Sequence, residues 1–462
     1  MPKVAKFFLR GCGVFLEILV IILILLAFFI RSSTFQTYLA HKAASYYSKE
    51  WKTQVQLQRV DIDFFDRIYI EGVKLLDLKQ RTLLKVSSLE VKILDFGLEH
   101  LTLKEIVVSN GKVWVCAEKP NGVMNFAFIS DYFASSDTSS SSSPFSLELR
   151  RISFKNTALR YDDFRVAESE FGLDPNHVEI KGLNLEMSKL ALDGPNISFA
   201  LDHFSFRDRS GLAIKELSAS FAMDATSLCL SHVNLLFNGS SLRMNTIKYA
   251  FDQQSDRNDF LNKAKISCVI APSTIDMRDI ALLVPELRGM NEKISIKGQL
   301  YNVPNRLKIR DLEVGIRKHT RIKANLELPD FSDWKAFNVR EQIVEACIDV
   351  KELNEVKLPG GKPLNLGNQV LSLGTIAWKN LNFTTQGGTL RLDPVEVSTS
   401  LGTLVVNAPM KLTPGSTGID IENLDIAKDL LLINALNLGP LTELTDVGVI
   451  DGSLTLSSIS TT

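Results

Sequence analysis

The sequence contains few residues of the kinds that carry out chemistry in proteins. It has five cysteines and six histidines in 462 residues. The cysteines lie far apart, with no C-x-x-C spacing, so we expect neither a zinc site nor a dense disulfide framework. The sequence also lacks a G-x-S-x-G, a P-loop, a dinucleotide fingerprint and an H-E-x-x-H. We therefore predict no catalytic residues, no metal and no cofactor, and we expect that the protein is not an enzyme.

The chain also lacks an excess of charge of either sign. Its formal net charge is −1, which argues against a nucleic-acid partner. Hydrophobic residues make up 45% of the chain, which is enough apolar material to build extensive cores.

One long apolar run stands near the amino end, from Val14 to Ile30, with Glu17 as its only charge. As a helix it would span roughly 26 Å, close to the hydrocarbon thickness of a bilayer. The alternative is a cleaved secretory signal, but Arg31 stands where a cleavage site needs a small neutral residue. We predict a single transmembrane helix with a short cytoplasmic tail, and with the rest of the chain outside. Its representative residues are Val14, Leu19, Ile22, Leu25, Phe28 and Ile30.

Helical spacing continues past the apolar run. Phe35, Leu39, Ala43 and either Tyr46 or Tyr47 recur at intervals of three and four residues, which predicts an amphipathic helix over Thr34–Trp51. This helix either lies at the level of the lipid headgroups or packs on the first strands. Further short helices are expected over Val123–Phe133, between Pro272 and Pro285, and over Asp429–Asn437.

After Val55 the apolar period changes to two, which is typical of strands with one wet face. Gly182 reverses the phase of this alternation, as a bulge would. The alternating residues that we expect to share one apolar surface are Leu89, Val91, Ile93, Ile152, Phe154, Val178, Ile180, Ile197, Phe199, Leu201, Ile294 and Ile296.

The pattern divides the chain into segments. We predict a tail and transmembrane helix at 1–31, an amphipathic helix at 32–54, a first β segment at 55–134, a Ser-rich loop at 135–144 and a long β segment at 145–462. So many strands need their apolar faces covered, yet few helices are available to cover them. Either two sheets close into sandwiches, or one curved sheet leaves an apolar groove open to a ligand such as a lipid acyl chain.

Several short motifs occur in order along the chain. They are FQTYLAHKAASYYSKEWKTQVQLQRVDIDFFDRIYIEGVKLLD, SNGKVWV followed by Asn125-Phe126, FSLELRRISFKNTALRYDD, SLCLSHVNLLFNGSSLRM, ISIKGQL and NLGPLTELTDVGVIDGSLTL. In this order they resemble the AsmA-like superfamily, specifically the TamB translocation and assembly subunits. The chain is shorter than those proteins and resembles their amino-terminal portion.

The resemblance implies a mainly β protein with a single amino-terminal transmembrane helix and an elongated, curved, largely antiparallel sheet that forms a hydrophobic groove. It also implies an anchor in the cell inner membrane, with the bulk of the chain in the periplasm. The expected partners are membrane lipids, through phospholipid acyl chains, and an outer-membrane barrel protein. The expected function is phospholipid transport toward the outer membrane, assistance to outer-membrane protein assembly, or both. The main alternative is an envelope scaffold that transports nothing, and an anchored periplasmic enzyme is a third.

The last strand is expected at Val447–Ile459, with Leu454 and Leu456 on one face. No proline, capping helix or charged residue follows it to blunt an edge. We therefore predict that this strand lies at the end of the sheet farther from the membrane helix, with its outer backbone groups unpaired.

Overall fold

The fold was analysed in a computed structural model of the chain. The structure describes residues 29, 31–63, 66–96, 100–134, 146–193, 196–259, 263–303, 306–328, 339–386, 389–406, 410–414, 419–421, 431–437, 449–454 and 459–460. The protein is mainly β with few helices, as the alternation predicts. The six representative residues of the predicted transmembrane helix lie outside the described residues, as does the Ser-rich loop. Among the helices that are described, none is both long and apolar enough to cross a bilayer.

The chain divides into two compact units. The first holds residues 1–170, 174–192 and 201–209, and the second holds residues 171–173, 193–200 and 210–462. The helices of the first unit are α2 (Ser33–Glu50) and α3 (Ala127–Ala134). Its strands are β1 (Val55–Gln56), β2 (Arg59–Asp63), β3 (Arg67–Leu76), β4 (Thr82–Phe96), β5 (His100–Ser109), β6 (Lys112–Ala117), β7 (Ser146–Leu149), β8 (Arg151–Asp163) and β9 (His177–Asp193), and β10 (Asn196–Asp208) is divided between the units.

The first unit combines antiparallel and parallel pairing. β3 pairs with β2 and with β4 in antiparallel fashion, and β4 pairs likewise with β5 and β6. β5 and β6, however, both pair with β8 in parallel. The parallel pairs arise because the connection from β6 to β8 is long and includes α3, whereas a short hairpin would join antiparallel strands.

The predicted change of phase at Gly182 is confirmed by the pairing of β8 with β9. Gly182 has a φ of +61°, and the register shifts on the facing strand between Thr157 and Leu159. Before the shift Ile180 faces Leu159, and beyond it Leu185 faces Phe154. The bulge therefore keeps apolar residues on one face of the strand on both sides of the kink.

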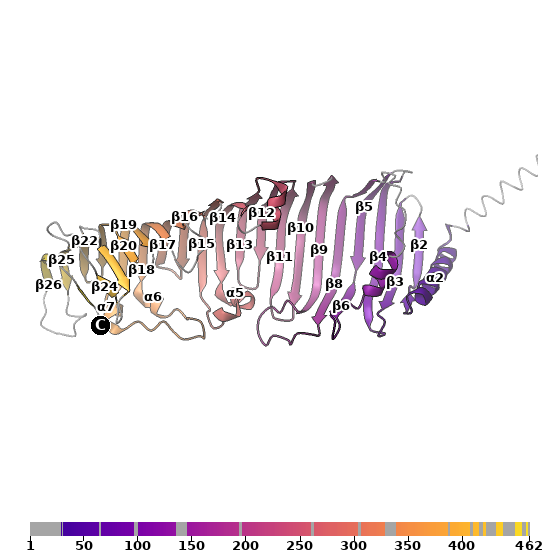
Figure 1. Ribbon diagram of the computed structural model, residues 1–462, viewed down its shortest axis with the longest axis horizontal. Coiled ribbons are helices and arrows are strands. Elements are labelled where there is room, and N and C mark those ends of the chain that lie inside the picture. Colours follow the sequence, from indigo (N-terminus) through magenta and orange to yellow (C-terminus); the bar gives the residue numbers. More distant parts are fainter. Residues whose placement is uncertain are drawn as a thin grey trace, which may run out of the picture. The chain divides into compact units, whose positions relative to one another are not determined.

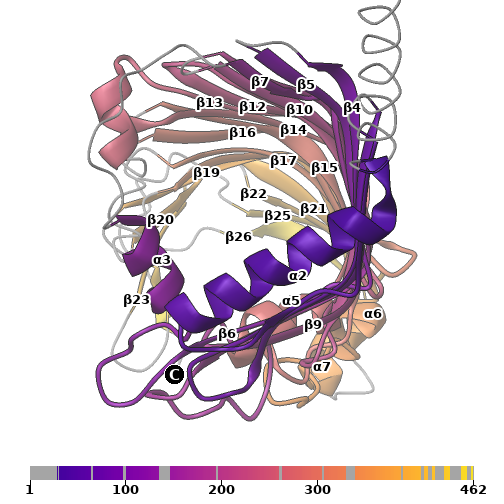
Figure 2. The ribbon, with the colours of Figure 1, turned by 90° about the vertical axis from the view of Figure 1, so that its right-hand side faces the viewer.

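Helix α2 packs on the first strands through the face opposite to its apolar stripe. Leu39 and Tyr46 of the stripe remain 50% and 54% exposed, whereas Gln36 and Ala44 are buried against the sheet. The helix thus packs on the first strands, which is one of the two alternatives that the sequence leaves open, and it does so through Gln36 and Ala44. Figure 2 shows α2 running across the strands of the first unit, with α3 beside its carboxyl end, where Trp51 contacts Phe128 and Tyr132.

The polar face of α2 satisfies the backbone of an edge strand. Gln36 Nε2 donates to the carbonyl of Ile62 at 2.9 Å, and the Ile62 N–H donates back to Gln36 Oε1 at 2.6 Å. Thr37 Oγ1 likewise donates to the carbonyl of Val60 at 3.1 Å and accepts from the Val60 N–H at 2.9 Å. The helix side chains thus take the place of a neighbouring strand, which protects an otherwise open edge.

The second unit contains the remaining strands and short helices. Its helices are α5 (Met277–Leu283), α6 (Val350–Asn354) and α7 (Asn368–Ser372), with short 3-10 turns at Gln254–Asp259 and Pro285–Leu287. The first eight strands are β11 (Ala213–Met223), β12 (Ser227–Leu236), β13 (Ser241–Ala250), β14 (Lys265–Asp276), β15 (Lys293–Val303), β16 (Arg306–Ile316), β17 (Thr320–Leu328) and β18 (Val339–Asp349). The others are β19 (Thr375–Gln386), β20 (Thr389–Leu392), β21 (Val395–Thr399), β22 (Gly402–Val406), β23 (Met410–Pro414), β24 (Ile419–Ile421), β25 (Leu431–Asn437), β26 (Val449–Leu454) and β27 (Ile459–Ser460).

From β11 to β19, each strand pairs in antiparallel fashion with the next one in the chain (Figure 1). Most of these connections are short, which favours antiparallel neighbours, whereas α5 lies between β14 and β15, and α6 and α7 lie between β18 and β19.

Two helix predictions in this unit need correction. The segment from Pro272 completes β14, and α5 begins only at Met277, where the Asp276 side chain accepts a hydrogen bond from the Arg278 N–H at 3.0 Å as an N-cap. Leu431–Asn437 is strand β25, and β22 and β26 pair with it. A short apolar run fits a helix or a strand equally well, and pairing with neighbouring strands decides between them.

The expected last strand begins at Val449, and Leu456 lies outside the described residues. Among the strands that the structure describes, β26 pairs with β25 alone, with Leu454 opposite Leu431. The distal placement of this strand stays a prediction.

Candidate functional site

The candidate site is an apolar face of the paired strands, because the register lines up apolar side chains strand after strand. In the second unit one such row takes one residue from each of β11 to β17. We call it the first apolar row, and it consists of Phe221, Leu230, Ile247, Cys268, Leu300, Ile309 and Leu326.

Every side chain of the first apolar row is half-buried. Phe199, one of the residues singled out in the sequence, joins the row by stacking on Phe221 with ring centroids 4.7 Å apart. Neighbouring positions on several of these strands carry charged side chains. Lys248, Lys308 and Glu327, for example, occupy a row on the other face. The two faces thus differ in polarity, as period two requires.

A second apolar row starts at Ile296, another of the residues singled out in the sequence. It continues through Val314, Ile322, Ala346, Trp378, Val397 and Leu404, each directly opposite the next. Ala346 is buried, and the others are half-buried. Ile294 lies two residues before Ile296 and faces Ile316.

Trp378 adds a polar atom to this row. Its indole Nε1 is buried and has no hydrogen-bond acceptor among the described residues. Buried N–H groups are nearly always paired, and an exception in a native protein needs an explanation. A ligand oxygen would supply the missing acceptor.

The first unit has shorter rows of the same kind. Leu89 faces Ile70 and Val108, and Val108 lies beside Phe154. A second row on the same strands, β3, β4, β5 and β8, consists of Ile68, Val91, Ile106 and Ile152.

The other residues singled out in the sequence occupy the same strands. Ile93 lies on β4 opposite Leu103, and Val178 and Ile180 lie on β9 opposite Tyr161 and Leu159. Leu201 is on β10 in the first unit, and Ile197 is on β10 in the second. All twelve of the residues singled out are half-buried.

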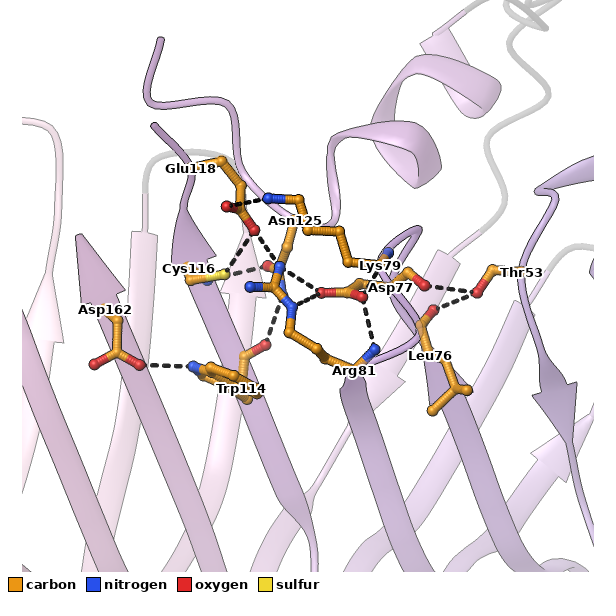
Figure 3. Close-up of polar contacts among 10 residues, drawn as sticks. All are labelled: Thr53, Leu76, Asp77, Lys79, Arg81, Trp114, Cys116, Glu118, Asn125 and Asp162. Carbon is orange, nitrogen blue, oxygen red and sulfur yellow. Dashed lines mark hydrogen bonds and ion pairs between the residues drawn. The ribbon is translucent and has the colours of Figure 1, made fainter. Parts of the chain in front are cut away.

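The strand ends of the first unit hold the densest polar cluster there, drawn in Figure 3. Asp77 is 1% exposed and accepts hydrogen bonds from the N–H groups of Lys79 and Arg81, both at 2.9 Å, and from Arg81 Nε at 2.7 Å. Arg81 also pairs with Glu118, which Lys79 contacts at 2.7 Å. The hydrogen bond from Lys79, assisted by Arg81, lowers the pKa of Glu118.

The other groups of this cluster are buried or hydrogen-bonded. Burial raises the pKa of the Cys116 thiol to about 11, so the thiol stays protonated and is a poor nucleophile. Asn125 accepts from the Cys116 N–H at 3.1 Å and donates to the Trp114 carbonyl at 3.0 Å, and Trp114 Nε1 donates to Asp162 at 2.7 Å. The cluster ties the ends of β3, β6 and β8 together.

Comparison with known proteins adds no assignment, since no family model, curated protein or solved structure matches the chain. The rows found only in the structure include Leu230, Ile247, Leu300, Ile309 and Trp378. Alternation marks such residues as apolar strand positions, but the sequence has no signal for which of them stand opposite one another.

Proposed function

We propose that the chain is an inner-membrane-anchored periplasmic protein of the AsmA/TamB type whose apolar face forms a curved hydrophobic groove. In this proposal phospholipid acyl chains lie along the apolar rows while they pass toward the outer membrane. An outer-membrane barrel protein is the proposed partner at the far end, and assistance to outer-membrane protein assembly is the related role.

The observation that carries the proposal is the half-buried state of the first apolar row. In a closed sandwich, facing side chains from a second sheet would bury such residues. A contiguous apolar surface larger than a few hundred Å² is rare on a soluble protein unless something binds it. Acyl chains fit a surface of this kind because they are long, apolar and without directional requirements.

The exposed face of α2 supports the membrane part of the proposal. Tyr38, Leu39 and Tyr46 are each at least 50% exposed, as is Phe29, which precedes the helix. Tyrosine is enriched at membrane–water interfaces, and Lys42 and Lys49 on the same exposed side suit anionic headgroups.

Native mass spectrometry of the detergent-purified chain tests the proposal. We expect phospholipid to remain bound after detergent removal and to be exchanged with labelled phospholipid from vesicles. If the protein emerges without lipid and exchanges none, the scaffold alternative replaces the transport proposal.

A further inference from the structure

Three lysines stand directly opposite one another on neighbouring strands of the first unit. Lys74 on β3 faces Lys85 on β4, and Lys85 faces Lys112 on β6. We call these residues the lysine row. Side chains in such positions have Cβ atoms about 5 Å apart, and like charges placed there destabilise a sheet. The row therefore carries an electrostatic cost that needs a compensating interaction.

Within the described part of the chain, none of the three lysines has an ion pair or hydrogen bond that would supply this compensation. Other lysines of the same unit are paired: Lys92 on β4 contacts Glu105 at 2.9 Å, and Lys181 on β9 contacts Glu179 at 2.7 Å. The lysine row differs in this respect from Lys92 and Lys181.

The lysine row also borders two hollows. One cavity of about 800 Å³ is lined by Lys74, Lys85 and Glu71, together with residues of α2. A second cavity of about 380 Å³ is lined by four basic residues, Lys85, Lys112, Arg160 and Lys181, and by one acidic residue, Glu179. Because Lys85 lines both, the two hollows adjoin at the centre of the row.

The row lies on the same face of β4 as Leu89, because Lys85 and Leu89 are four residues apart and no register shift lies between them. Lys85 stands between Leu84 and Val86, which pair with the apolar residues Val113 and Val73. Successive side chains on a strand point to opposite faces, so the lysines lie on the face opposite to these four residues.

We propose that the lysine row binds a ligand that carries two or more phosphate groups. Lysine ammonium groups bind phosphate as point charges, and the row extends over about 10 Å because neighbouring strands lie about 5 Å apart. That length accommodates more than one phosphate. The ligand is either a soluble polyphosphate anion or an array of phospholipid headgroups, and titration with the soluble anion tests this binding separately from lipid in the proposed groove.

The experiment uses the full chain in detergent, titrated with sodium tripolyphosphate in a calorimeter at low salt. We expect binding that becomes about tenfold weaker in Lys85→Gln, since one charge-assisted contact is lost. Lys92→Gln is the matched control, because it removes a paired lysine from the same strand, and it should leave the affinity unchanged. Added salt should weaken the binding of tripolyphosphate to the wild type and to Lys92→Gln.

Titration with a short-chain phosphatidylglycerol in the same detergent separates the two sources of phosphate, because a membrane anchor would hold every variant on vesicles. Lipid binding that weakens in Lys85→Gln, together with weak binding of tripolyphosphate, identifies headgroups as the ligand. Strong binding of tripolyphosphate, together with weak binding of the lipid, identifies a soluble anion. Equal binding by the wild type, Lys85→Gln and Lys92→Gln to both probes would overturn the proposal.

A thermal measurement without any phosphate gives a second readout. Removing the central charge relieves two repulsive pairs, so Lys85→Gln should raise Tm by about 1–4 °C. Lys92→Gln, which loses an ion pair, should lower Tm or leave it unchanged. A lower Tm for Lys85→Gln would mean that the lysine stabilises the fold, and the argument from repulsion would be wrong.

Discussion

The substitution Ile296→Glu distinguishes an open groove from a closed core. Ile296 is half-buried between Ser273 on β14 and Val314 on β16, at the start of the second apolar row. A carboxylate at this position would stay partly hydrated if the face is open. In a closed sandwich the same carboxylate would be buried without a partner.

The two cases differ in the size of the expected effect. Full burial of an isoleucine side chain contributes about 1.5–3 kcal/mol, so losing a half-buried one costs about 1–1.5 kcal/mol. We therefore expect Ile296→Glu to lower the free energy of unfolding by about 1–2 kcal/mol. An unpaired carboxylate in a closed core would cost several kcal/mol more.

Urea unfolding measures the stability, and native mass spectrometry measures bound phospholipid in the same preparation. Ile296→Glu should keep a cooperative transition but lose most of its phospholipid. The matched control is Ser295→Glu, which places the same charge on the adjacent exposed position and the opposite face. It should change stability by about 0.5 kcal/mol or less and retain lipid. Failure of Ile296→Glu to fold, or unchanged lipid content, would refute the reasoning.

Four further outcomes are expected. Arg81→Met leaves the buried Asp77 carboxylate without its side-chain partner and should cost about 3 kcal/mol of stability in urea unfolding. Adding Asp77→Asn to Arg81→Met should restore part of this stability. If the double variant instead loses the sum of the two single losses, the reasoning is contradicted. Gln36→Ala removes both hydrogen bonds to the edge strand and should lower the free energy of unfolding by about 2 kcal/mol. It should also promote concentration-dependent association, measured by light scattering, and a stable monomer would argue against the edge-protection role. Burial would raise the pKa of Glu352, but hydrogen bonds from the backbone and ring of His319 and from neighbouring N–H groups lower it to about 2. The ionised carboxylate therefore contributes up to about 3 kcal/mol of stability, which is present above pH 4.5 and is lost as pH falls toward 2. Glu352→Gln should flatten acid denaturation over this window, and an unchanged profile would contradict the assignment. Trp378→Phe removes the unpaired N–H and should leave stability within about 1 kcal/mol while weakening phospholipid retention in native mass spectrometry; a larger loss of stability would show that the indole N–H has a structural partner.

The sequence by itself determines the strands of this protein and the faces of many of them. The alternation of Leu89, Val91 and Ile93 follows from the two-residue period of an extended backbone, which is a local property. The reversal at Gly182 is equally local, because a residue with positive φ shifts the alternation wherever it occurs. The mainly β class and the small number of helices could therefore be predicted.

Only the tertiary structure decided which residues meet. Leu431–Asn437 became a strand because β22 and β26 pair with it, and α2 turned Gln36 inward because an edge strand offered backbone groups to bond. The apolar rows and the lysine row depend on register between strands, which local sequence does not encode. Register is set by pairing between distant segments, so the candidate site appears only when those segments are brought together.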